Sequence, residues 1–155
     1  MFTTEISENV KKKAFHAAFN QALKAYDADE VPVGSVILYN NQIIARNRNR
    51  IIEKRDPTAH AEILAIKAAA KKLKNERLID CHLFTTLEPC TMCAGAIILA
   101  RISSVFFLAE EARLPALRYL LKMKNYNHYP EVYFYRDFMH DSSELLKNFF
   151  KKKRK

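Results

Sequence analysis

The sequence has few of the features that mark membrane, secreted and disulfide-rich proteins. Its 155 residues include two glycines and three cysteines. No run approaches the roughly 18 consecutive apolar residues expected of a membrane span, and the opening MFTTEISENVKKKAF has no apolar core of the kind a signal peptide needs. These absences predict a cytosolic protein, in which a disulfide framework is not expected and three cysteines could not all pair.

Length and composition predict one soluble globular domain. Apolar residues make up 49% of the chain and charged residues 28%, which are ordinary proportions for such proteins. The chain is long enough to bury a core, and no linker, repeat or low-complexity stretch divides it. We therefore expect a single domain over residues 1–150, followed by a basic tail at 151–155.

The positive charge is unevenly distributed along the chain. The net charge is +9, and the closing residues KKKRK supply five of these charges, so the rest of the chain carries +4. A second basic cluster lies in RNRNRIIEKR, residues 46–55. This distribution suits a polyanionic partner, but a solubilising tail and a solvated loop explain it equally well.

Hydrophobic periodicity and turn residues predict alternating helices and strands. Residues 5–27 carry apolar side chains at helical spacing, and Asn40-Asn41 between two β-rich runs predicts a hairpin within 31–47. Further helices are expected over 60–74, 90–101, 114–124 and 142–153, and strands over 81–86, 103–108 and 131–135. A hairpin followed by alternating strands and helices argues for a layered α/β fold.

The two glycines lie in the predicted first strand and in a predicted helix. At Gly34, the missing side chain permits a bulge or the close approach of a ligand. Gly95 costs about 1 kcal/mol relative to alanine inside a helix. We expect close packing of that helix to offset this cost.

Three potential metal ligands, His60, Cys90 and Cys93, lie at or near predicted helix starts. Cysteines at i and i+3 share one helix face, so both sulfurs can reach one ion. A helix N-terminus also favours thiolate, and Pro89 suits that position because its missing N–H has no helical partner to lose. Three protein ligands leave the fourth tetrahedral position of Zn²⁺ open, which is typical of a catalytic site, where the pKa of a bound water can fall toward about 7.

Glu62 follows His60 by two residues and could act on such a water. It begins the same predicted helix and can approach the water without coordinating the metal, so its carboxylate could carry a proton to a leaving group. This predicts hydrolytic attack on an electrophilic carbon, of which deamination of an aromatic base is one case. A CxxC pair alone also occurs in redox proteins and in structural zinc sites with a fourth ligand, so these interpretations stay open here.

The two motifs together are more specific than either alone. TAHAE at 58–62 with LEPCTMCAGAI at 87–97 resembles the zinc-dependent cytidine/deoxycytidylate deaminase superfamily. Nearly the whole chain resembles the bacterial tRNA-specific adenosine deaminases, which convert adenosine to inosine at the first anticodon position. The segments that match them in order and spacing are EVPVGSVI at 30–37, ARNRN at 45–49, DPTAHAEILAI at 56–66, RLIDCHLFTTLEPCTMCAGAI at 77–97 and ARISSVFF at 100–107.

This resemblance implies a fold and a set of active-site residues. The fold would be a three-layer α/β/α arrangement with a five-stranded mixed sheet, as in cytidine deaminases, assembled as a homodimer. One Zn²⁺ per subunit would be bound by the two cysteines and the histidine, and Glu62 would be the catalytic proton carrier. The residues implied to contact the base are Asn49, Val31, Pro32 and the backbone at Ala61.

The partner implied by the resemblance is the anticodon stem-loop of a tRNA, with no membrane contact. A base that reacts within RNA must be splayed out of a loop, and aromatic rings interleaved with basic residues suit that task. The candidate RNA contacts are Asn127, His128, Phe149 and Lys153, and we expect one ring of the Phe149-Phe150 pair to pack inward. The alternatives are a free-base or nucleoside deaminase acting on guanine or cytosine, and a non-catalytic RNA-binding zinc protein.

One segment departs from the resemblance. After SSVFF these deaminases usually have a glycine-containing loop with an aspartate and a lysine, whereas residues 108–124 here contain no glycine and carry Glu110 and Glu111. Two acids beside a polyanion are unfavourable unless basic side chains compensate. The candidates for compensation are Arg113, Arg118, Lys122 and Lys124.

Overall fold

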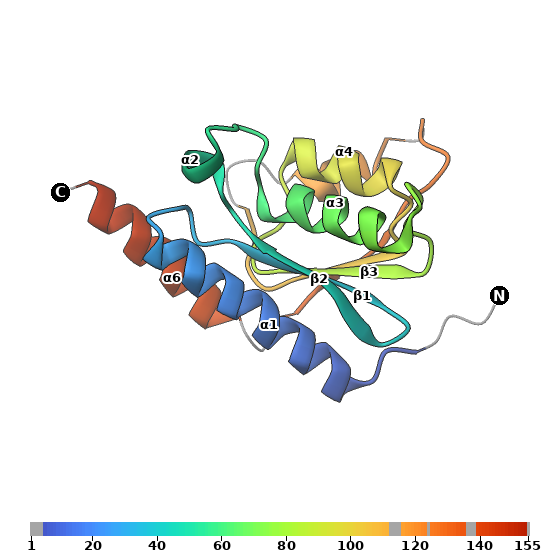
Figure 1. The fold of residues 1–155 in the computed structure, drawn as a ribbon, viewed down its shortest axis with the longest axis horizontal. Coiled ribbons are helices and arrows are strands. Elements are labelled where there is room, and N and C mark those ends of the chain that lie inside the picture. The colour runs from blue at the N-terminus through green and yellow to red at the C-terminus, as the bar shows by residue number, and fades with distance from the viewer. Residues whose placement is uncertain (1–4, 112–115, 124, 136–138, 155) are drawn as a thin grey trace.

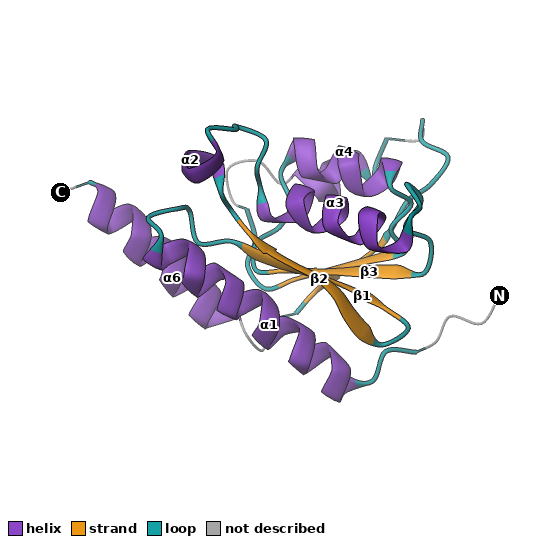
Figure 2. Ribbon diagram, in the orientation of Figure 1, coloured by secondary structure: helices purple, strands orange, loops and turns teal. Residues whose placement is uncertain are grey.

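A five-stranded mixed sheet forms the centre of the protein in a computed structural model, which describes residues 5–111, 116–123, 125–135 and 139–154. The strand order is β2-β1-β3-β4-β5 (Figure 2). The strands are β1 (Gly34–Tyr39), β2 (Gln42–Arg48), β3 (Cys81–Thr85), β4 (Ser104–Phe107) and β5 (Glu131–Phe134). β1 pairs antiparallel with β2 and with β3, whereas the β3–β4 and β4–β5 pairs are parallel.

Helices cover both faces of the sheet. The helices are α1 (Glu8–Asp27), α2 (Ile51–Lys54), α3 (Ala61–Leu73), α4 (Thr91–Leu99), α5 (Ala116–Leu120) and α6 (Met139–Lys153). Figure 1 shows α3 and α4 side by side on one face, and α1 with α6 on the other. The predicted three-layer α/β/α fold with a five-stranded mixed sheet is therefore confirmed.

The predicted elements are present, with differences in their extent. The hairpin turns at Asn40 and Asn41, which both adopt positive φ angles (50° and 61°), as a tight turn between β1 and β2 requires. The helix expected over 114–124 is described only as the five-residue α5. The four-residue α2 was not predicted, because one helical turn has no periodicity to recognise. Helix α6 continues through Lys153, so the basic tail begins as helix.

The two faces of the sheet bury separate cores, because successive side chains of a strand point to opposite sides. Toward α3 and α4, a cluster includes Leu83 and Val105. Toward α1, Phe84 stacks on Phe106 with ring centroids 4.4 Å apart, and Phe15 packs edge-on against Phe84 at 5.0 Å. These two cores fix the positions of α3 and α4 on one face of the sheet and of α1 on the other.

The two glycines have roles that differ from those predicted. A Cβ atom at Gly34 would lie 2.0 Å from the Ala18 carbonyl oxygen and 2.6 Å from the Ala22 nitrogen. The backbone of α1, rather than a ligand, therefore makes the close approach, and the bulge in the β1–β2 pairing falls between Ile37 and Leu38 instead. A Cβ at Gly95 would meet nothing within 4 Å, so close packing within the chain does not offset the cost of this glycine.

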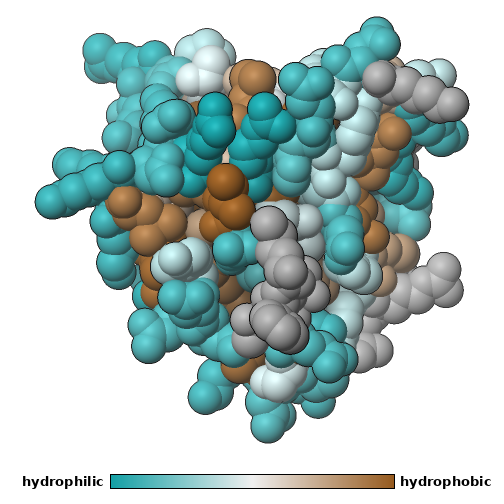
Figure 3. Space-filling model, turned by 90° about the vertical axis from the view of Figure 1, so that its right-hand side faces the viewer, coloured by the Kyte–Doolittle hydropathy of each residue, from teal (hydrophilic) through white to brown (hydrophobic). Residues whose placement is uncertain are grey.

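The surface is largely hydrophilic on the side opposite α2 and the C-terminus. Figure 3 views this side and shows hydrophobic residues in small patches between hydrophilic ones. Within the described residues, every helix is too short or too polar to cross a membrane.

Candidate active site

The carboxyl ends of three strands lie together at one end of the sheet. Since β2 and β3 both pair antiparallel with β1 and β4 pairs parallel with β3, the ends at Arg48, Thr85 and Phe107 lie together, beside the residues that lead into β1. Ligands of open α/β sheets commonly bind beyond the carboxyl ends of the strands. The segments 49–62 and 86–93, which hold the predicted catalytic motifs, begin here.

Two helix N-termini bring the three predicted metal ligands together. His60 is the N-cap of α3, Cys90 is the N-cap of α4, and Cys93 lies in the first turn of α4. His60 Nδ1 is 3.6 Å from the sulfur of each cysteine. The three ligand atoms lie within 4.8 Å of one another, and across the described parts of the chain this is the one such group of three His, Cys, Asp or Glu residues.

These distances fit a tetrahedral zinc site. Zn–S bonds of about 2.3 Å and Zn–N bonds of about 2.0–2.1 Å place a tetrahedral sulfur and nitrogen about 3.6 Å apart. The donor set of one imidazole and two thiols is one that zinc favours, and it leaves one coordination position for water or substrate. All three cysteines are free thiols in the structure, so the site is not a Cys90–Cys93 disulfide.

The electrostatics of the cluster favour a cation. Hydrogen bonds from Cys93 and then from His60, opposed by burial, lower the pKa of Cys90 to about 4, so Cys90 is a thiolate at neutral pH. The contact with Cys90, together with burial, raises the pKa of Cys93. A divalent cation between the two sulfurs would offset the repulsion between two thiolates.

Glu62 lies beside the cluster without belonging to it. The side chain is buried, with 4% of its surface exposed, and one carboxylate oxygen lies 3.6 Å from the sulfur of Cys93. Burial raises the pKa of the Glu62 carboxyl above its usual value. A carboxyl group with a raised pKa holds a proton more readily than an ordinary glutamate, which suits its predicted role as a proton carrier.

The predicted base-binding residues surround the start of α3. Asn49 is buried, and its Oδ1 accepts a hydrogen bond of 2.7 Å from the backbone N–H of Ala61. With Oδ1 engaged, Nδ2 is the end of the amide left to donate to a ligand. Val31 and Pro32 lie next to it in space, since the N–H of Asn49 donates to the carbonyl of Val33.

A cavity of about 570 Å³ lies between this end of the sheet and α6. Its lining residues are Val31, Leu87, Ala109, Glu110, Glu111, Ser143, Leu146, Lys147, Phe150, Lys151 and Arg154. Of the two adjacent phenylalanines, Phe149 packs inward against Tyr26 with 4% of its surface exposed, whereas Phe150 lines the cavity. Lys153 pairs with Asp29. The basic residues that face this cavity are therefore Lys151 and Arg154 of the predicted basic tail, together with Lys147, which sequence analysis had not singled out.

Asn127 and His128 lie at the other end of the parallel strands. They precede β5, and His128 Nε2 is 2.7 Å from the carbonyl oxygen of Ile102, which precedes β4. The structure thus separates them from the zinc ligands by the length of β4. Their predicted contact with RNA stays a prediction.

Sequence analysis missed two buried carboxylates at this end of the sheet, Glu30 and Glu88, which are 2% and 1% exposed. Glu88 accepts two hydrogen bonds from Arg118, at 2.7 and 3.0 Å, and one from the backbone N–H of Glu111. Arg118 also lies 3.7 Å from Glu110, so it supplies part of the expected compensation. Each missed acid precedes an apolar residue or a proline at the edge of an apolar segment, which is the signal that could have identified it.

Comparison with known proteins assigns this geometry to deaminases. The MafB19-like deaminase family matches residues 9–154. The tRNA-specific adenosine deaminase of Aquifex aeolicus is 39% identical over 147 residues, covering 93% of this chain and 96% of its own. A solved structure from a study of A-to-I editing by tRNA:A34 deaminases at the wobble position superposes with a TM-score of 0.84 at 38% identity, covering 87% of this chain and 99% of that one. The guanine deaminase of Bacillus subtilis superposes with a TM-score of 0.62 at 31% identity, covering 90% and 93%.

The fold and the site define a deaminase, and the chain belongs to the MafB19-like deaminase family, among the bacterial tRNA-specific adenosine deaminases. The predicted resemblance and the prediction that the chain is an enzyme are thereby confirmed.

Proposed function

We propose that this enzyme converts adenosine to inosine by hydrolytic deamination at the wobble position of tRNA, with one Zn²⁺ bound by His60, Cys90 and Cys93. The observation that carries the proposal is the convergence of these ligands with Glu62 and Asn49 at the start of α3. Together they supply a metal site, a proton carrier and an oriented amide. Relatives named for this activity match over most of the chain.

The chemistry requires addition of water to C6 of the purine and departure of ammonia. A bound zinc ion would supply a Lewis acid that acidifies water at its open coordination position. Glu62 accepts one proton as water adds to C6 and delivers it to N1 of the base. It then carries the second proton from the new C6 hydroxyl to the amino group, so that the amine leaves as ammonia. Asn49 holds the base by donating from Nδ2, and the buried surroundings exclude other water.

The cavity beside α6 shares Val31 with the proposed base pocket and would take nucleotides that flank the reacting base in a tRNA loop. Apolar Val31 and Leu87 line it together with Phe150, three basic residues and two acids, which are Lys147, Lys151, Arg154, Glu110 and Glu111. Such a mixture of a ring and basic groups suits stacked bases and their phosphates. A tRNA substrate would place the enzyme in the cytoplasm.

A homodimer would cover the outer face of α4. Met92, Gly95, Ala96 and Leu99 follow one another at helical spacing, and Met92 and Leu99 are 36% and 78% exposed. The absence of any atom within 4 Å of a Cβ at Gly95 marks this face as open in the single chain. We propose that a second copy packs here, next to the helix that begins with Cys90.

The test is inosine formation in a transcribed tRNA that carries adenosine at the wobble position. We expect inosine at that position alone. Glu62→Ala should lower the rate by at least about 10²-fold, because a general acid–base group typically contributes 10²–10⁴-fold, while the zinc content measured by mass spectrometry stays at one per subunit. Glu76→Ala, an exposed glutamate, should retain the wild-type rate.

The control substrates are free guanine and free cytosine. Ammonia release from either of them by the wild-type protein, with tRNA left unmodified, would contradict the tRNA assignment and leave a free-base deaminase, as the similarity to guanine deaminase would then suggest.

A further inference from the structure

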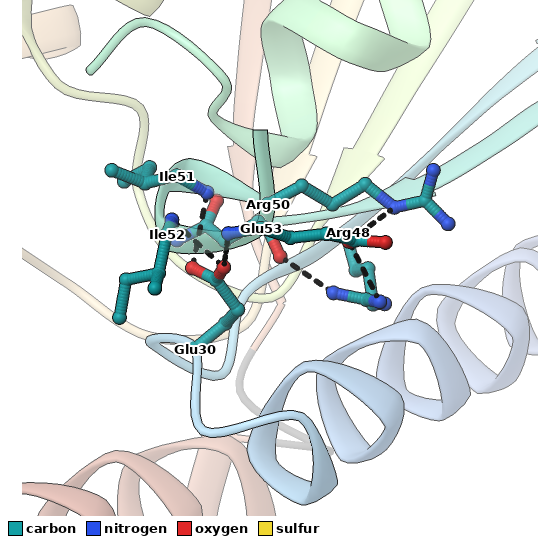
Figure 4. A network of polar contacts seen from close by, with 7 residues as sticks. Glu30, Arg48, Arg50, Ile51, Ile52 and Glu53 are labelled. Atoms are coloured by element: carbon teal, nitrogen blue, oxygen red, sulfur yellow. Dashed lines mark hydrogen bonds and ion pairs between the residues drawn. The ribbon is translucent and has the colours of Figure 1, made fainter. Parts of the chain in front are cut away.

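A buried carboxylate caps the short helix that follows β2. Glu30 accepts three backbone hydrogen bonds, from Ile51 at 3.0 Å and from Ile52 and Glu53 at 2.9 Å each. Figure 4 shows the Glu30 carboxylate pointing into the first turn of α2. The side chain is 2% exposed, so its charge is stabilised by these N–H groups and by the positive end of the turn rather than by water.

This contact joins two segments that border the predicted base pocket. Glu30 directly precedes Val31 and Pro32, and α2 begins two residues after Asn49. The same two segments are also joined by the hydrogen bond from the N–H of Asn49 to the carbonyl of Val33, at 3.1 Å. The position of the Asn49 amide therefore depends on how firmly α2 is held.

The connection continues from α2 to the metal-binding end of α3. The N–H of Arg50 donates to the carbonyl of Ala59 at 3.0 Å, and Asn49 Oδ1 accepts from the N–H of Ala61. His60, a predicted zinc ligand, lies between these two anchored residues. A shift of α2 would thus move the Asn49 amide relative to the N–H of Ala61 that it accepts from.

Helix α2 has little else to hold it. A single turn is unstable by itself, since nucleation of a helix is unfavourable and short helices depend on tertiary contacts. None of its four residues is buried, and the outer side chain of Glu53 makes only ion pairs with Arg48 and Arg50. Glu30 is therefore the principal internal contact of this turn among the described residues.

We propose that Glu30 is a positioning residue of the deaminase reaction, which acts by anchoring α2 and through it the Asn49 amide. The proposal rests on the proposed function, because it takes Asn49 as the group that binds the base. Glu30 itself is too enclosed by its three backbone partners to contact substrate.

The first experiment replaces the carboxylate by an amide of the same shape. Glu30→Gln keeps one accepting oxygen but turns an NH₂ group toward backbone N–H donors, so that at least one of the three hydrogen bonds is lost. We expect the single-turnover rate of inosine formation at saturating tRNA to fall at least tenfold, with zinc content unchanged. The control is Glu76→Gln, the same substitution at an exposed glutamate outside this network, which should change the rate less than twofold.

A double-variant cycle separates positioning from general loss of stability. If Glu30 acts through Asn49, then adding Glu30→Gln to Asn49→Ala should lower the rate by less than twofold further, because the group that it positions is already absent. The proposal would be overturned if the rate of the double variant were lowered by the product of the two factors measured for Glu30→Gln and Asn49→Ala alone.

Amide hydrogen exchange provides a readout that does not depend on activity. Zinc-loaded Glu30→Gln should exchange at least tenfold faster in the peptides that cover residues 49–61, with unchanged protection in β3 and α1. Unchanged exchange in 49–61 would overturn the positioning role, even if the wild-type protein proved inactive on tRNA. If Glu30→Gln does not fold, Glu30→Asp retains a carboxylate that is one methylene shorter and should show the same pattern with smaller changes.

Discussion

At the scale of single residues, a buried ion pair lies beside the predicted metal ligands. Glu88, two residues before Cys90, is buried and accepts two hydrogen bonds from Arg118 of α5. The pair connects the glycine-free segment 108–124 to the segment that carries the predicted ligands Cys90 and Cys93. The acids of the glycine-free segment are thus partly balanced before any RNA binds.

Removing Arg118 should therefore destabilise the protein through Glu88. Breaking a buried ion pair leaves an uncompensated charge, which costs about 3–5 kcal/mol when both partners are buried. Arg118 is about half exposed, so water can replace part of its effect and we expect Arg118→Ala to lower the free energy of unfolding by about 2 kcal/mol. Urea unfolding monitored by circular dichroism measures this change.

A variant in which glutamine replaces Glu88 supplies the control for this prediction, because it removes the buried carboxylate. In a Glu88→Gln background, Arg118→Ala should cost less than about 0.5 kcal/mol, since no buried charge remains to be compensated. An equal cost in both backgrounds would show that Arg118 stabilises the chain by packing instead.

At the scale of elements, contact between α1 and β1 depends on a missing side chain. The backbone of α1 lies so close to Gly34 that any side chain there would displace the helix. Overpacking a core typically costs 1–3 kcal/mol, and a clash with main-chain atoms is harder to relieve, so Gly34→Ala should lower the free energy of unfolding by about 3 kcal/mol or more.

The second glycine is the matched control in the same urea experiment. In the Leu99→Glu background, which removes the proposed contact with a second copy, Gly95→Ala should leave the free energy of unfolding unchanged or raise it by up to about 1 kcal/mol. Alanine is the better helix former, and nothing within the chain obstructs its methyl group. Equal destabilisation by both variants would contradict the assigned role of Gly34.

At the scale of the whole molecule, the outer face of α4 should decide the assembly state. Leu99 is 78% exposed, so Leu99→Glu costs the single chain little but would bury an unpaired charge between two copies. We expect light scattering after size exclusion to show a dimer for the wild-type protein and a monomer for Leu99→Glu. Leu23→Glu, on the opposite layer in α1, should remain dimeric, and a dimer that persists in the Leu99→Glu variant would place the interface elsewhere.

The helices, the strands and a candidate metal site could be predicted from sequence, because local patterns and a family resemblance identify them. Periodicity located the helices and strands, and Asn40-Asn41 located the hairpin, since each of these patterns lies in neighbouring residues. The resemblance joined His60 to Cys90 and Cys93, which follow it by thirty residues or more. Only the tertiary structure decided what contacts what across the sheet. Glu30 binding α2, Arg118 binding Glu88, α1 against Gly34 and Phe150 rather than Phe149 at the cavity all join residues that are distant in sequence or depend on which face a helix presents. Long-range packing fixes these contacts, and no local spacing encodes them.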